Sequence, residues 1–139
     1  RDVDREDLVT DEAELARLQQ IFEGSPWAQS APEEVEVEVH LAFDEHVVVC
    51  KIDAVFKQGD RYQIVDWKTG RAPTNKADLE LKQLQLALYR LAYSQWKNIE
   101  PALVDAVFYF VSEDTIIVPE RVYSEAELFA LWRTVTGSR

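Results

Sequence analysis

The sequence has 139 residues, 47% hydrophobic and 11% aromatic, which is enough for a single domain with a substantial core. No apolar run approaches the roughly 20 residues that cross a membrane, and no signal-like leader opens the chain. We therefore expect a soluble, cytoplasmic protein without a membrane partner. The single cysteine, Cys50, excludes an internal disulfide and a cysteine-based zinc site. The absence of any methionine predicts that residues 1–139 are a fragment of a longer protein.

The formal net charge of −11 argues at first against a nucleic-acid partner, because affinity for phosphates comes mainly from Lys and Arg. The charge is unevenly distributed along the chain. Residues 1–50 hold 14 acids and 3 bases, residues 51–97 hold 5 acids and 9 bases, and residues 98–139 hold 7 acids and 3 bases. Only the middle segment is basic, and we interpret the acidic first third as a solvated surface.

Hydrophobic periodicity predicts an α/β domain with a mixed central sheet flanked by helices. Strands are predicted at 34–43, 47–57, 62–68, 105–111 and 115–118. Helices are predicted at 11–22, 79–96 and 125–135. The first three strands should form an antiparallel meander, with Gly59 and Asp60 in its second turn. Ser124 and Glu127 form a capping box for the last helix.

The second turn sets a register for the meander. If Gly59 and Asp60 form a two-residue loop, opposed residue numbers sum to 119 and Asp53 lies opposite Asp66. Side chains at i and i+2 share a sheet face, so Lys68 joins both carboxylates while Trp67 points to the other side. Two opposed carboxylates, about 5 Å apart, repel each other unless a cation neutralises them.

These residue types suit a hard divalent cation. Mg²⁺ prefers oxygen ligands, typically one or two carboxylates with a backbone carbonyl and water. Asp53, Asp66 and the main-chain carbonyl of Trp67 are therefore the predicted ligands of Mg²⁺ or Mn²⁺. A bound cation can activate water for attack on phosphorus, while Lys68 stabilises charge on the phosphate oxygens. The predicted catalytic residues are Asp53, Asp66 and Lys68, and the predicted reaction is phosphodiester hydrolysis.

Three segments carry a resemblance to a known family. Residues 51–56 read KIDAVF, residues 64–70 read IVDWKTG and residues 85–89 read QLALY. In order and spacing they resemble the signature of RecB-like nuclease domains, in the PD-(D/E)XK superfamily, over residues 33–96. The resemblance implies a restriction-endonuclease-like core, metal binding by Asp53 and Asp66, catalysis by Lys68, and DNA contacts by Gln85 and Tyr89.

The same resemblance implies a context. RecB-like domains belong to ATP-dependent DNA helicase–nucleases that act as exonucleases in end processing and recombinational repair. The implied partners are DNA, the remainder of the parent helicase chain and a second helicase–nuclease subunit. No glycine-rich phosphate-binding loop with Lys and Ser or Thr is present, so we expect no ATP site in this chain.

The chain departs from the family pattern at two places. Cys50 stands where the family has a glycine, and no histidine precedes His40, although the family has a metal-binding histidine on an upstream helix. We therefore expect an amino-terminal truncation that can leave the isolated fragment inactive. Two alternatives stay open, a noncatalytic nuclease-fold module that guides DNA or scaffolds the helicase, and an interaction domain without nucleic acid. It also stays open whether Glu38 is a further metal ligand. The same register places Lys51 opposite Lys68, and whether Lys51 contacts phosphate or only offsets the acidic pair is open as well.

Overall fold

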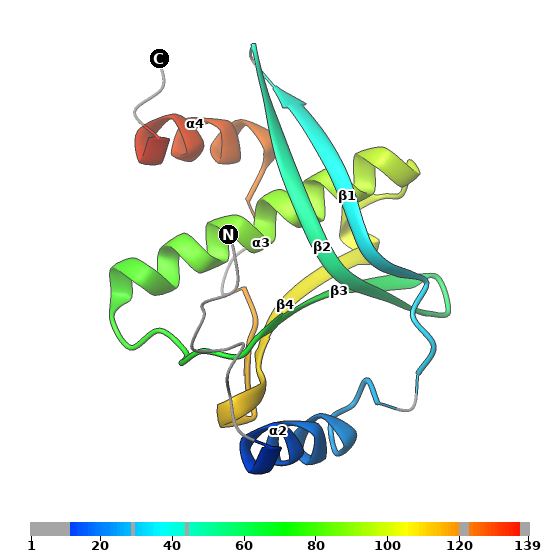
Figure 1. Ribbon diagram of the computed structural model, residues 1–139. Coiled ribbons are helices and arrows are strands. Elements are labelled where there is room, and N and C mark those ends of the chain that lie inside the picture. Colours follow the sequence, from blue (N-terminus) through cyan, green and yellow to red (C-terminus); the bar gives the residue numbers. More distant parts are fainter. Residues whose placement is uncertain (1–11, 29, 44, 120–122, 137–139) are drawn as a thin grey trace.

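The computed structural model describes residues 12–28, 30–43, 45–119 and 123–136 (Figure 1). One mixed sheet has the strand order β1-β2-β3-β4-β5. The strands are β1 (Glu34–Phe43), β2 (His46–Gln58), β3 (Arg61–Lys68), β4 (Val104–Phe110) and β5 (Thr115–Ile117). The α-helices are α2 (Glu12–Glu23), α3 (Lys76–Lys97) and α4 (Glu125–Thr136). The predicted α/β class and mixed central sheet are confirmed.

The sheet combines antiparallel and parallel pairing. The strands β1, β2 and β3 form the predicted antiparallel meander, β3 pairs with β4 in parallel, and β5 returns antiparallel to β4. A parallel pair needs a long crossover, and α3 provides it between β3 and β4. This helix begins earlier than predicted because the Asn75 side chain caps it, accepting a hydrogen bond from the Asp78 backbone N–H at 2.8 Å.

Both faces of the central strands are covered. On one face Ile64 of β3 and Phe108 of β4 pack against α3, which crosses the sheet in Figure 1. On the other face Val65 and Tyr109 pack against Trp27, which follows α2. Burial on both sides explains why β4, with the sequence VDAVFYF, is apolar at every position but one rather than alternating.

The last helix begins at the predicted capping box. The Ser124 backbone N–H donates to Glu127 Oε1 at 2.9 Å, and the Glu127 backbone N–H donates to Ser124 Oγ at 3.1 Å. Leu128, 2% exposed, anchors α4 in the core that α3 shares. Among the described helices none is long and apolar enough to cross a membrane.

The β1–β2 hairpin is distorted at Asp53. Val35 pairs with Ala54 and Val37 with Ile52, which leaves Glu36 and Asp53 facing each other without a described pairing. Glu36 has φ = 50°, in the left-handed region that non-glycine residues rarely adopt. Ile52 and Val55 both join the core under α3, although strict alternation would place them on opposite faces. The backbone therefore kinks at the position that carries the first predicted ligand.

Exchanging Gly for Ala at this kink tests the backbone conformation. At Glu36 we expect the Gly variant to exceed the Ala variant in free energy of unfolding by about 1 kcal/mol, because Ala is strained at positive φ. At Glu38, in the same strand, the order should reverse by roughly 0.5–1 kcal/mol, because Gly has the greater freedom when unfolded. Urea denaturation of the four variants measures both differences. The same order at both positions would contradict the kink.

Candidate metal-dependent active site

The register predicted for β2 and β3 is confirmed over its paired length. Pairs run from Gln58 with Arg61 to Ala54 with Val65, and each pair of numbers sums to 119. The described pairing stops one residue short of Asp53 and Asp66. There the Asp53 side chain takes the place of a backbone partner, and its Oδ2 accepts a hydrogen bond from the Trp67 backbone N–H at 2.9 Å. The Asp53 carboxylate thereby reaches β3 beside Asp66.

Asp66 is the most constrained group of the site, since it is only 4% exposed. Its Oδ2 forms an ion pair with Lys68 Nζ at 3.0 Å and is buried without a neutral hydrogen-bond donor among the described residues. Burial raises the pKa of Asp66 to about 7, a hydrogen bond with the Asp53 carboxyl adds to the rise, and the charge of Lys68 offsets part of it. The Asp66 carboxyl is therefore harder to ionise than an exposed one.

Lys68 lies between Asp66 and an aromatic ring. Its Nζ is 5.3 Å from the centroid of the Phe108 ring, and Phe108 is fully buried opposite Asp66 in the parallel β3–β4 register. The Lys68 side chain keeps 33% of its surface exposed, so its ammonium can reach a group arriving from solvent. Phe108 is not among the residues predicted from the sequence, because its place depends on which strand pairs with β3.

Gln85 and Tyr89 lie together beside the carboxyl pair. The Gln85 amide donates a hydrogen bond to the Tyr89 hydroxyl at 2.7 Å, across one turn of α3. Burial raises the pKa of Tyr89 to about 12, and the nearby negative charge of Asp66 adds to the rise. Cys50 is fully buried near Tyr89, and burial raises the pKa of its thiol to about 11. Cys50 is thus an unreactive apolar group that fills space behind the site.

The residues present fit a divalent cation. Two carboxylates from neighbouring strands form a hard oxygen set, and one of their oxygens, Asp66 Oδ2, is buried without a hydrogen-bond donor among the described residues. The described residues contain no group of three or more His, Cys, Asp and Glu suited to a metal, so backbone oxygen and water would complete the shell. The Trp67 carbonyl stays the predicted protein ligand. The Trp67 indole packs on the other face, 5.7 Å from the Trp27 ring, as expected of a core residue.

The remaining candidates lie elsewhere on the chain. Glu38 and His40 are exposed and paired at 2.9 Å, and the hydrogen bond from His40 lowers the pKa of Glu38. They therefore belong to the solvated face of β1. Lys51 pairs with Glu38 across the hairpin. The expected placement of Lys51 opposite Lys68 lies beyond the described β2–β3 pairing, which ends at Ala54, and stays a prediction.

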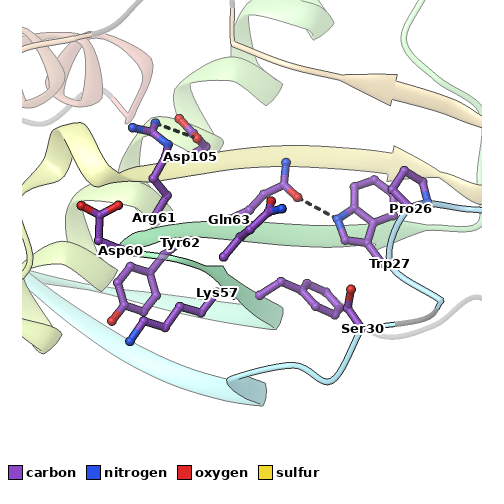
Figure 2. A pocket seen from close by; sticks show the side chains of 11 residues that line it. Pro26, Trp27, Ser30, Lys57, Asp60, Arg61, Tyr62, Gln63 and Asp105 are labelled. Carbon is purple, nitrogen blue, oxygen red and sulfur yellow. Dashed lines mark hydrogen bonds and ion pairs between the residues drawn. The ribbon is translucent and has the colours of Figure 1, made fainter.

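A hollow of about 670 Å³ lies outside this site, at the turn end of the β2–β3 hairpin (Figure 2). Trp27 and Gln63 form part of its lining, and the Trp27 indole N–H donates to Gln63 Oε1 at 2.7 Å. Figure 2 also shows Arg61 paired with Asp105, at 3.0 Å. None of the predicted site residues lines this hollow.

A mixed sheet that brings two carboxylates and a lysine to one place defines a class of candidate metal-dependent hydrolases. The family model of the PD-(D/E)XK nuclease superfamily matches residues 2–137, and the chain belongs to this superfamily. Its members are generally metal-dependent nucleases.

The comparison with solved structures agrees on the fold. The crystal structure of SSO0001 is similar with a TM-score of 0.53 and 16% sequence identity, over 98% of this chain. The chain spans 62% of that longer chain. The restriction-endonuclease-like fold is therefore confirmed. A search of the curated proteins found no match.

The raised pKa of Asp66 predicts how stability depends on pH without metal. A carboxyl whose pKa is higher when folded stabilises the fold fully below its unfolded pKa, near 4, and loses that contribution as pH rises through about 7. In EDTA, the melting temperature of wild type relative to Asp66→Asn should therefore fall by several degrees between pH 4.5 and 7.5. Asp60→Asn, at an exposed turn position, serves as the control. A constant difference between wild type and Asp66→Asn would contradict the buried acid.

A cation that binds only the folded site should raise its stability by RT ln(1 + [L]/Kd). With Kd on the order of 1 mM, 10 mM Mn²⁺ would contribute about 1.4 kcal/mol, which is a few degrees of melting temperature. Asp66→Asn should lose this response, while Asp60→Asn should keep it. Melting curves with and without Mn²⁺, at constant ionic strength, measure the effect. Equal responses of wild type and Asp66→Asn would mean that the ions act on diffuse surface charge.

Proposed function

We propose that the chain is a RecB-like, Mg²⁺- or Mn²⁺-dependent deoxyribonuclease domain of an ATP-dependent helicase–nuclease. The observation that carries the proposal is the convergence of Asp53, Asp66 and Lys68 on one face of a nuclease-superfamily sheet. The signature-like segments within residues 33–96 support the RecB-like assignment. The proposed role is exonucleolytic end processing in recombinational repair in the cytoplasm, with DNA, the rest of the helicase chain and a second helicase–nuclease subunit as partners.

The roles of the residues follow from their surroundings. Asp53, Asp66 and the Trp67 carbonyl would hold the cation. When bound, the cation supplies an activated water and neutralises charge on the phosphate. Lys68, held between Asp66 and the Phe108 ring, can place its ammonium against a phosphate oxygen, where it stabilises the charge that develops during hydrolysis.

The Gln85–Tyr89 pair is proposed to position the DNA strand. Since the Tyr89 hydroxyl accepts a hydrogen bond from Gln85, its own O–H is directed away from the amide and can donate to a phosphate oxygen. The basic segment 51–97, with 9 bases and 5 acids, contains the site and most of the meander strands β2 and β3. Local positive charge on this segment supports DNA binding despite the net charge of −11.

Site variants with matched controls test the proposal. With a dye-labelled DNA substrate, wild type should cut only when Mg²⁺ or Mn²⁺ is present. Asp66→Ala should abolish cutting, and Lys68→Ala should lower the rate roughly 10²–10³-fold, the scale for losing one group that stabilises the transition state. Asp60→Ala and Lys57→Ala, which change the same residue types at exposed positions of the β2–β3 hairpin, should cut like wild type.

In the parent protein, DNA cutting and ATP-driven unwinding can be measured separately. Asp66→Ala should remove cutting there while unwinding persists. Residual metal-dependent cutting by Asp66→Ala would place the active site elsewhere. No metal-dependent cutting by the unmodified parent would favour a noncatalytic module that guides DNA.

A further inference from the structure

A small hollow of about 290 Å³ opens beside the candidate active site. Three elements that are distant in the sequence form its walls. Val49 comes from the outer half of β2, Leu81 from the first turns of α3, and Trp132 from α4. We call this hollow the apolar slot.

The apolar slot shares two residues with the candidate site. Gln85 and Tyr89 line the slot, and the Tyr89 hydroxyl is close enough to Asp66 for that charge to raise its pKa. Gln85 and Tyr89, the residues proposed to position the DNA strand, therefore line the slot and also lie near the carboxyl pair. A nucleotide held by these two residues would have its base or sugar beside the slot.

The residues that line the slot indicate which kind of molecule it would bind. Among the described residues no charged side chain lines it, and its walls are aliphatic apart from Trp132, Tyr89, Gln85 and the Cys50 thiol. Val49 and Leu81 are each 48% exposed, so apolar surface here still faces solvent. A phosphate would lose its hydration in such a slot without gaining a charged partner. The flat face of a nucleobase gains by contact with an indole and aliphatic groups.

The size of the slot also limits the occupant. A volume of about 290 Å³ lies at the lower end of the range typical of ligand pockets, roughly 300–1,000 Å³. That room suits one base rather than a stacked pair or a helix of another protein. The nearness of Gln85 and Tyr89 to the carboxyl pair and the lack of charged side chains among the described lining residues together favour a base over other apolar partners.

We propose that the apolar slot receives the nucleobase next to the scissile phosphate, with Trp132 as its stacking surface. This inference rests on the proposed nuclease function. Because a base cannot enter the slot while stacked and paired in a duplex, that nucleotide must be unstacked before cutting. Trp132 and Leu81 then contribute affinity that depends on the base and not on the phosphate backbone.

Two oligomers of equal length and charge test the proposal, an oligothymidylate and the same backbone without bases. Their binding is measured by fluorescence anisotropy of a dye label, at low salt with Ca²⁺ in place of Mg²⁺. Wild type should bind the oligothymidylate more tightly. Trp132→Leu should weaken that binding roughly 5- to 150-fold, the range for losing one base–aromatic stack, and leave binding of the abasic oligomer unchanged.

Two further variants keep the test decisive. Trp132 is half buried and its loss can unsettle α4, so Leu81→Ser, at a half-exposed position, provides an independent change that should lower only base-dependent binding. Trp96→Leu is the matched control, because that indole is 47% exposed near the other end of α3 and does not line the slot. It should bind both oligomers like wild type.

The outcomes separate this inference from the nuclease itself. Equal binding of both oligomers by wild type, equal weakening of both by Trp132→Leu and Leu81→Ser, or no binding of either oligomer would each overturn the slot proposal. Cutting is measured separately with Mn²⁺. Metal-dependent cutting without base-dependent binding would leave the nuclease intact and remove only the slot. Base-dependent binding without cutting would support the slot and contradict the nuclease function.

Discussion

The burial of Asp66 beside a second carboxylate is the constraint on which the candidate site depends. A carboxyl that is 4% exposed, next to Asp53 and with one oxygen lacking a hydrogen-bond donor among the described residues, is costly to ionise. Only a proton, the ammonium of Lys68 or a bound cation can reduce that cost. Without a metal, the pKa of Asp66 is raised to about 7, so that the carboxyl is protonated more easily. The two carboxylates offer hard oxygen ligands with which a divalent ion could replace that proton.

The surrounding architecture holds that acidic pair in place. The β2–β3 turn sets the register, and the kink opposite Glu36 interrupts regular pairing, so that Asp53 bonds to the Trp67 backbone N–H. The parallel strand β4 places the Phe108 ring under Lys68. The crossover helix α3 that parallel pairing requires then brings Gln85 and Tyr89 over the same face. The site is thus assembled where a local hairpin meets a long-range crossover.

The two faces of β3 have different roles. Asp66 and Lys68 face α3 and the candidate site, while Val65 and Trp67 anchor the strand against Trp27 and Tyr109 on the other side. A firmly packed reverse face limits movement of the acidic pair, which metal coordination and phosphate positioning both require. The excess of bases in residues 51–97 would allow the proposed DNA binding by a chain of net charge −11.

The sequence by itself determined the order of elements, the meander and the convergence of Asp53 with Asp66 and Lys68, because a two-residue turn and the alternation of strand faces are local properties. Only the tertiary structure decided which strand lies beside β3, and so placed Phe108 against Lys68. The kink opposite Glu36, the end of the regular β2–β3 pairing at Ala54 and the position of Trp132 beside Gln85 also depended on it. Each of these results from contacts between elements far apart in the chain, which periodicity within one element does not encode.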